Sequence, residues 1–477
     1  MSPPLERIGE VLYEVGKAYR RDMRVPARVF ADEALMAQLS RDSSLEQLVN
    51  VATLPGVTRQ VLGMPDMHEG YGFPVGGVAA TLLPDGVISP GGIGFDINCG
   101  VRLLASSVRP EDFRPGIEAL VHELSRSIPT GYGRHGRLSL SPDALNRVLA
   151  EGCRYVVAAL GQGRDEDLDF IESRGSLSHA DPSKVSARAK ERGQDQLGTL
   201  GGGNHFIEVQ RVAELYDEKA AEALGLFAGQ LAVLLHTGSR GLGHQVCTDY
   251  VKAMDQAQAR LGIALPDRQL ACAPLSSPEG RDYFAAMCAA ANFAWANRQV
   301  LTAKVREVWQ RLAGAGPGAE LRVVYDVAHN VAKIESFGGR DLCVHRKGAT
   351  RAFGPSHPEL PPAYRGVGQP IFIPGSMGTA SFVLVGTDEA AELSLASTCH
   401  GAGRALSRTA AKRLVAGDVL RRELGKRGIV VRCPSNAELA EEAPAAYKDV
   451  ERVVDVVARA GIARKVAKLV PLGVLKG

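Results

Sequence analysis

Glycine-rich, strand-like stretches alternate with helical stretches along the whole chain, and this alternation restricts the fold more than any other feature. The strand-like stretches are residues 61–105, 196–210, 230–243, 320–330 and 369–387. The helical stretches are residues 28–40, 110–127, 142–161, 244–260, 279–313, 404–425 and 436–460. The pattern predicts a mixed α/β fold. Glycine and proline together make up about 17% of the 477 residues, against an average near ~12%, which favours tight turns over a helical bundle.

The chain has no repeat at a solenoid or propeller period and no Ser/Gly linker that would separate independent domains. We therefore expect one large domain over residues 1–477, with mixed β-sheets surrounded by helices. Hydrophobic residues at 45% and charged residues at 23% exclude a disordered or low-complexity protein.

Several functional classes are also disfavoured. No apolar run approaches the roughly 18 to 20 residues of a membrane helix, and the start MSPPLERIGE does not resemble a signal peptide, so we expect a cytoplasmic protein with no membrane contact. The eight cysteines form no CxxC pair, which argues against a zinc ribbon or a disulfide framework and favours buried thiols. The helical stretch 279–313 places Phe284 and Trp295 on one face, where we expect core packing and not base stacking.

Residues able to bind metal recur where apolar, strand-like runs begin or end. LAVLLH ends at His236, LRVVYDVAH ends at His329, GTLGGGNH ends at His205, and GGIGFDINCG offers Asp96 and Cys99. A buried strand delivers such a side chain rigidly to a cleft, so the repetition indicates a shared metal site. Each histidine could instead be a hydrogen-bonded core residue. A thiolate with imidazoles and a carboxylate suits a borderline divalent ion, and Cys99 could bridge two ions; ligand chemistry alone favours zinc over manganese.

Three further loops combine glycine with small hydroxyl residues: PGSMGTASF (374–382), STCHGAGR (397–404) and RKGATRAF (346–353). Backbone amides approach phosphate closely where no Cβ intervenes. His400 stands before the predicted helix 404–425, as a candidate nucleophile toward phosphorus or as a capping residue.

The cations Arg404, Arg408 and Lys412 would share one face of that helix. They could form part of a surface that binds RNA, could bind the phosphates of a nucleotide, or could simply be solvent-exposed surface charges. They belong to the basic segment 401–430, in a chain whose net charge is only +3. No GxxxxGK[ST] phosphate loop is present, so a nucleotide would be held in another way.

These blocks, with MPDMHEGYGFPVGG (64–77), HTGSRGLGH (236–244) and the terminal PLGVLKG, closely resemble the RtcB family of RNA-splicing and repair ligases over residues 64–477. Two departures are small: GGGNH stands for the common GSGNH, and STCH for SACH. Neither removes a ligand or the nucleophile. The resemblance implies a single mixed α/β domain that is neither a Rossmann nor a P-loop fold.

The resemblance also implies a ligase that depends on GTP and two manganese ions. It would join RNA ending in a 3′-phosphate or 2′,3′-cyclic phosphate to RNA bearing a 5′-hydroxyl, through a guanylylated His400 and an RNA-(3′)pp(5′)G intermediate. Cys99 would bridge both ions, with His205 and His236 at one and Asp96 and His329 at the other. The expected nucleotide contacts are Asn204, Glu208, His329, Asn330, Pro374, Gly375, Ser376, Met377, Ser381, His400, Gly401, Ala402, Gly403, Tyr447 and Lys476.

Two other functions stay open on the residues alone. A metal-dependent phosphoesterase acting on cyclic phosphate ends would need Asp96, Cys99 and the histidines but not His400. A noncatalytic RNA-binding or repair-scaffold protein would need neither. The physiological RNA and the need for an activating partner protein are not determined by the sequence.

Overall fold

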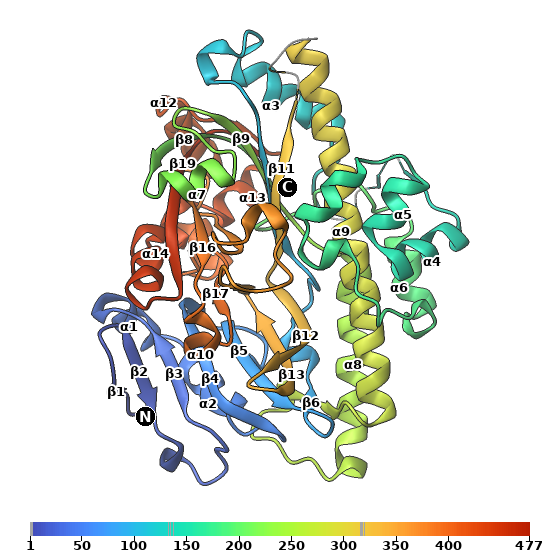
Figure 1. Cartoon of the computed structure of the whole chain (residues 1–477), viewed down its shortest axis with the longest axis vertical. Helices are drawn as coiled ribbons and strands as arrows, with labels where there is room; N and C mark the ends of the chain where they lie inside the picture. Colours follow the sequence, from blue (N-terminus) through green and yellow to red (C-terminus); the bar gives the residue numbers. More distant parts are fainter. Residues whose placement is uncertain (1–2, 132, 134, 137, 315–317, 319) are drawn as a thin grey trace.

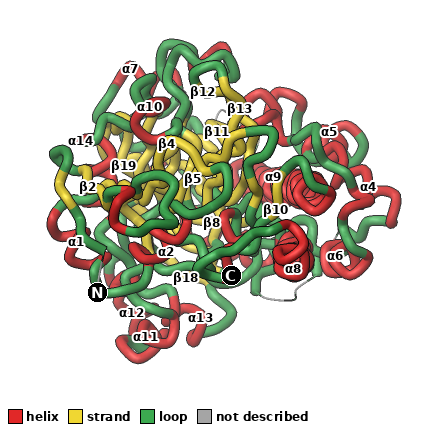
Figure 2. Tube along the Cα trace, turned by 90° about the horizontal axis from the view of Figure 1, so that it is seen from below, coloured by secondary structure: helices red, strands yellow, loops and turns green. Residues whose placement is uncertain are grey.

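Two large β-sheets form the centre of the molecule and helices surround them (Figures 1 and 2). The computed structural model describes residues 3–131, 133, 135–136, 138–314, 318 and 320–477. The first sheet contains, in spatial order, β1 (Glu6–Arg7), β2 (Leu12–Val15), β3 (Ala27–Phe30), β4 (Val57–His68), β5 (Val75–Leu82), β13 (Arg340–Lys347) and β12 (Asn330–Phe337).

The second sheet supplies most of the strands that end at the candidate site. Its order is β11 (Arg322–Ala328), β7 (Gly100–Ala105), β9 (Leu231–Thr237), β8 (Phe206–Leu215), β19 (Ala463–Lys476), β16 (Ser381–Gly386) and β15 (Pro370–Ile373), with β18 (Val430–Arg432) parallel to β19. Two small sheets pair β6 (Val87–Ile88) with β10 (Ala273–Pro274), and β14 (Ala349–Arg351) with β17 (Ser397–Cys399).

The described helices range from one turn to the 36 residues of α9. They are α1 (Glu33–Leu39), α2 (Ser44–Val51), α3 (Gly116–Ser127), α4 (Pro142–Glu151), α5 (Cys153–Ala158), α6 (Ala187–Gly193), α7 (Glu218–Ala223), α8 (Arg240–Leu261), α9 (Pro278–Ala313), α10 (Ala390–Ser394), α11 (Arg408–Leu414), α12 (Gly417–Lys426), α13 (Asn436–Glu441) and α14 (Val450–Arg459). Within the described ranges, no helix has both the length and the apolar character needed to cross a membrane.

The mixed α/β class is confirmed, and α9 matches its prediction closely. The Ser277 side chain caps its start by accepting a hydrogen bond from the Gly280 amide, with Pro278 in the first turn. Trp295 is fully buried and Phe284 is 8% exposed. Both are therefore core residues, as expected, and not an open base-stacking surface.

Several predicted helices are wrong in extent. The stretch 28–40 begins as strand β3, and its helix starts only after Asp32, which caps α1. The stretch 404–425 is not one helix: Ser407 caps α11, so Arg404 lies in the preceding loop, and α12 follows an extended Val415. Local capping therefore outweighed the helical spacing of the cations. The stretches 142–161 and 436–460 are likewise interrupted, between α4 and α5 and between α13 and α14.

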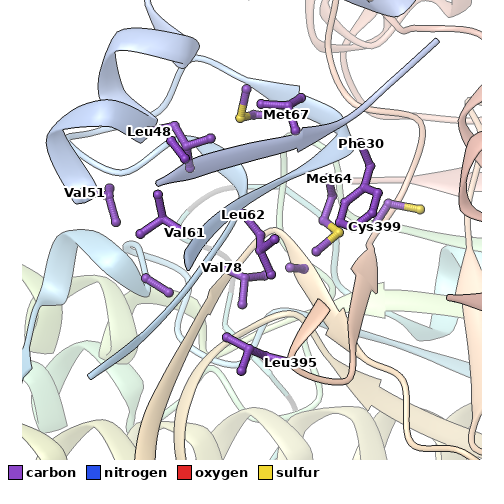
Figure 3. Packing of buried hydrophobic residues seen from close by; sticks show 14 of the residues in the cluster. Phe30, Leu48, Val51, Val61, Leu62, Met64, Met67, Val78, Leu395 and Cys399 are labelled. Atoms are coloured by element: carbon purple, nitrogen blue, oxygen red, sulfur yellow. The ribbon is translucent and has the colours of Figure 1, made fainter. Parts of the chain in front are cut away.

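The largest hydrophobic cluster joins segments that are distant in sequence. Figure 3 shows Met64 of β4 beside Phe30 of β3 and Cys399 of β17, and Met67 of β4 belongs to the same cluster. All four side chains are at most 1% exposed. Burial of apolar surface therefore holds the strand that precedes residue 400 against β4.

A buried ion cluster ties α9 to the second sheet. Asp326 of β11 accepts hydrogen bonds from Arg102 of β7 and Arg298 of α9, both at 2.8 Å, and all three side chains are fully buried. Arg298 also donates to the backbone carbonyls of Asn98 at 2.8 Å and Thr237 at 2.9 Å. One helical side chain thus fixes the loop before β7 and the end of β9.

The substitution Asp326→Asn should lower the free energy of unfolding by about 3–5 kcal/mol, because it leaves two buried guanidinium groups without a compensating charge. Chemical denaturation followed by circular dichroism measures this change. Asp418→Asn is the matched control, since the ion pair of Asp418 with Arg422 is exposed and should contribute at most about 1 kcal/mol. Equal effects of the two substitutions would contradict the stabilising role of the buried cluster.

Candidate functional site

Five side chains able to bind metal meet at adjoining strand ends of the second sheet. Cys99 directly precedes β7, His205 directly precedes β8, His236 lies near the end of β9, and His329 directly follows β11. The registers place Val101 opposite His236 and Phe206 opposite the same histidine. Neighbouring strands therefore bring together residues that are separated by more than 200 positions.

The donor atoms of these side chains lie within hydrogen-bonding range of one another. The Cys99 sulfur is 3.4 Å from His205 Nε2 and 3.3 Å from His236 Nε2. His205 Nε2 is 2.8 Å from Asp96 Oδ2, and His236 Nε2 is 3.3 Å from His329 Nε2. The five residues thus form two groups that share Cys99: Asp96, Cys99 and His205, and Cys99, His236 and His329.

This division differs from the one implied by the family resemblance, which placed His205 with His236 and Asp96 with His329. In the structure the 2.8 Å contact joins His205 to Asp96, and the 3.3 Å contact joins His236 to His329. Which of the five residues would share an ion therefore stays a prediction.

The ionisation of the group suits a divalent cation. Burial lowers the pKa of His236 and of His329 well below the ordinary histidine value, so both rings are neutral and can offer a lone pair. Burial also raises the pKa of the Cys99 thiol, with the nearby Asp96 carboxylate adding to the effect. A thiolate at this position requires a compensating cation. Nitrogen, sulfur and oxygen donors together fit a borderline transition-metal ion.

His400 lies beside this group at the end of β17. Its ring centroid is 4.9 Å from that of His329. Its Nδ1 is 2.6 Å from Asp66 Oδ2, and its backbone amide donates to the same oxygen at 3.0 Å. A carboxylate can only accept a hydrogen bond, so we place the ring proton of His400 on Nδ1. This leaves a lone pair on Nε2. This is the arrangement that a nucleophilic imidazole needs.

Asp66 carries out a role that the sequence did not assign. It lies in MPDMH, a block that supported the resemblance, but 334 positions separate it from His400. A glycine allows the close approach: a Cβ on Gly403, whose φ is +75°, would lie 2.3 Å from the Asp66 carbonyl oxygen. Any larger residue at position 403 would push the loop after His400 away from β4.

One cavity of about 360 Å³ joins the metal-binding group, His400 and the glycine-rich loops. Most predicted nucleotide contacts line it: Asn204, Glu208, His329, Asn330, Pro374, Gly375, Ser376, Met377, His400, Gly401, Ala402, Gly403, Tyr447 and Lys476. Ser381 does not line it, but its hydroxyl accepts from Gln210 at 2.9 Å and from the Gly375 amide at 3.4 Å. Ser381 therefore supports the wall of the cavity.

Two buried carboxyl groups in this cavity differ in ionisation. Burial raises the pKa of Glu208 to about 8, although Gln210 and Lys476 oppose the shift. Burial would also raise the pKa of Glu442, but the charges of Lys476 and Arg404 and a hydrogen bond from Tyr447 lower it below the ordinary value. Glu442 is thus ionised at neutral pH and Glu208 is mostly protonated.

Glu442 was missed because no motif surrounds it in the sequence. Its carboxylate accepts a short hydrogen bond from the Tyr447 hydroxyl and one from Arg404 at 3.2 Å, and it lies 4.0 Å from Lys476 Nζ. Further lining residues without a predicted role are His68, Tyr71, Phe95 and Lys347. Burial lowers the pKa of Lys347 to about 7.

The structure does not bring the three predicted RNA-binding cations together on one helix. Arg404 lines the cavity from a loop and packs over the Tyr447 ring at 5.2 Å. Arg408 lines the cavity and lies 3.5 Å from Glu442, whereas Lys412 contacts Glu441 outside it. The prediction that these three cations lie on one face of one helix is therefore wrong. Contact of these side chains with RNA stays a prediction.

Comparison with known proteins gives one consistent result. The family model described as "tRNA-splicing ligase RtcB" matches residues 47–477. A tRNA-splicing ligase RtcB of Archaeoglobus fulgidus is 53% identical, and one of Thermococcus kodakarensis 52% identical, each over 99% of both chains. An RNA-splicing ligase RtcB of Mycobacterium tuberculosis is 52% identical over 90% of this chain and all of its own length.

Metal binding can be tested directly with cobalt(II), whose bond to a thiolate gives a charge-transfer absorption band. The two groups predict two bound ions per chain and a thiolate band. Cys99→Ala should remove the band and weaken both sites, because one sulfur serves both, while His329→Ala should weaken one site only. Equilibrium dialysis counts the ions. His122→Ala, an exposed histidine on α3, is the control; two unaltered ions in Cys99→Ala would reject the shared thiol.

Proposed function

The chain belongs to the RtcB family of RNA-splicing ligases, and on this premise we propose that it uses GTP and two manganese ions to join RNA ends. The ends are a 3′-phosphate or 2′,3′-cyclic phosphate and a 5′-hydroxyl. RNA ligation follows from the family. The end chemistry, the nucleotide and the metal are our proposal. The observation that supports it best is that His400, oriented by Asp66, shares one cavity with the metal-binding group.

The two groups that share Cys99 would hold the manganese ions, which supply Lewis-acid stabilisation of phosphate charge. His400 Nε2 attacks the α-phosphorus of GTP, a nitrogen–phosphorus bond forms, and pyrophosphate leaves. Asp66 accepts the hydrogen bond from Nδ1–H of His400 and stabilises the positive charge that develops on the ring. Residues Gly401–Gly403 line the cavity next to His400. The Ala402 amide donates to the Pro374 carbonyl at 3.1 Å, so the amides of the two glycines are the candidates to donate to the transferring phosphate.

The remaining steps transfer GMP and then release it. A cyclic end is first hydrolysed to a 3′-phosphate. An oxygen of that phosphate attacks the phosphorus on His400, the nitrogen–phosphorus bond breaks, and the RNA carries an activated (3′)pp(5′)G end. The 5′-hydroxyl of the second RNA then attacks the 3′-phosphorus, and GMP leaves as the phosphodiester forms.

Glu208 and Lys476 support guanine as the base of the nucleotide. A carboxylate can accept from both N1–H and N2–H of guanine, whereas adenine offers no matching pair of donors. Both side chains line the cavity and are at most 3% exposed. A base at this position is therefore read in surroundings that exclude most water.

Labelling with GTP that carries a radioactive α-phosphate distinguishes the ligase from the two other functions. We expect an acid-labile label on the protein that His400→Ala abolishes. Asp66→Asn should slow labelling by roughly a hundredfold to ten-thousandfold, because an amide can donate to Nδ1 and so favours the proton on Nε2. Asp418→Asn should label normally.

A phosphoesterase would open cyclic phosphate ends without any label, and a noncatalytic scaffold would give neither label nor joined product. Labelling that persists in His400→Ala would reject His400 as the nucleophile.

The raised pKa of Glu208 predicts a pH-dependent preference for guanine. Recognition of N1–H and N2–H requires the ionised carboxylate, so GTP binding must displace a proton below a pKa of about 8. The ratio of labelling efficiency with GTP to that with ATP should therefore rise from pH 6 to pH 8, by at most about tenfold per unit, and then level off. Metal binding affects both nucleotides and cancels in the ratio. Glu208→Gln should lower the ratio and flatten its profile; an equal slope in that variant would refute the assignment.

A further inference from the structure

Three aromatic rings form a continuous ladder at the mouth of the cavity. The ring centroids of Tyr71 and Phe95 are 5.4 Å apart in an edge-to-face arrangement. Those of Phe95 and His244 are 4.9 Å apart and the two rings are stacked at 26°. The rings come from three segments: the loop between β4 and β5, the loop before β7, and the first turns of α8.

The ladder runs from two residues of the cavity wall to an exposed residue on the protein surface. Tyr71 and Phe95 line the cavity and are partly exposed, and His244 is exposed. Phe95 directly precedes Asp96, so the ladder adjoins the metal-binding group. An extended ligand could therefore lie along the ladder with one end beside the reacting groups.

The other aromatic residues that line this cavity in the described structure are already engaged. Tyr447 donates its hydroxyl proton to Glu442 and carries the Arg404 guanidinium over its ring. Phe206 is 9% exposed, with the Lys476 ammonium 5.8 Å from its centroid. The ring face of Tyr447 is thus already covered by a cation and Phe206 is buried, whereas His244 at the end of the ladder is exposed.

We propose that the ladder of Tyr71, Phe95 and His244 stacks the base of the RNA nucleotide that bears the 3′-phosphate. The proposal rests on the RNA ligase function given above. A ligase for RNA ends must accept a splayed, single-stranded nucleotide, and aromatic stacking binds any base because every base has a π-face. The 3′ end fits best, because its phosphate takes part in both GMP transfer and sealing and so must stay beside the metal-binding group that Phe95 adjoins.

Paired changes in the protein and the RNA test this contact. The protein variants are His244→Ala and Phe95→Leu, with His122→Ala as the control on another helix. The RNA substrates carry either a normal or an abasic nucleotide at the 3′-phosphate end, and a third RNA set moves the abasic nucleotide to the 5′-hydroxyl end. The efficiency of GMP transfer to the 3′-phosphate RNA, and the rate of joining for the set with the 5′ abasic nucleotide, are each divided by the rate at which the same protein labels itself with GTP. This ratio removes any effect on the nucleotide site or on the fold.

We expect the 3′ abasic nucleotide to lower the transfer efficiency of the wild-type protein by roughly tenfold, and His244→Ala to do the same with normal RNA. The two changes together should cost little more than either one, because both remove the same contact. His244→Trp should restore efficiency, and His122→Ala should behave as wild type.

Four results would overturn the inference. Independent, multiplicative effects of the two changes would mean that His244 and the base do not touch. An abasic effect confined to the 5′-hydroxyl end would place the wrong nucleotide on the ladder. If neither the His244 variant nor the abasic nucleotide changes self-labelling or joining, the ladder proposal is rejected and the proposed function stands. If the wild-type chain shows neither self-labelling nor joining, the proposed function is rejected and the ladder proposal with it.

Discussion

The ion cluster of Asp326 with Arg298 and Arg102 is the constraint on which the site depends. Taking these charges out of water is costly, and the cost is offset only while the guanidinium groups keep their carboxylate and carbonyl partners. Two of those partners are the carbonyls of Asn98 and Thr237, the residues next to Cys99 and His236. Arg298 of α9 therefore fixes the backbone beside two of the metal-binding residues. Their positions do not depend on contacts between the ligand side chains alone.

Apolar packing positions His400 in a comparable way. The cluster around Met64, Met67 and Cys399 presses β17 against β4, and so delivers His400 to Asp66. Gly403 lets the following loop approach within a distance that no Cβ would permit. Hydrophobic burial, the absence of a Cβ at Gly403 and the Asp66 carboxylate together place the ring proton of His400 on Nδ1 and leave the lone pair on Nε2.

The cavity also separates two carboxyl groups by function. Glu442 lies among Lys476, Arg404 and Tyr447 and keeps its charge, whereas Glu208 has weaker compensation and holds its proton near neutral pH. Glu442 can therefore anchor the cationic wall, while the proton of Glu208 can be displaced by a ligand that brings its own hydrogen-bond donors. The aromatic ladder would add, on our proposal, a second recognition surface that stacks any base.

The sequence by itself determined the mixed α/β class, the long helix α9 and the identity of the five metal-capable residues, because apolar runs and short motifs are local patterns. Much of the cavity lining, including Glu208, Tyr447 and Lys476, was expected only from the family resemblance. It misjudged the helix 404–425, since a single cap at Ser407 outweighed the spacing of its cations. Only the tertiary structure decided that Asp66 orients His400, that Asp96 groups with His205, that Glu442 charges the cavity wall, and that Tyr71, Phe95 and His244 form one ladder. Each of these contacts joins segments from different parts of the chain, and their distances follow from strand register and core packing, which no local pattern encodes.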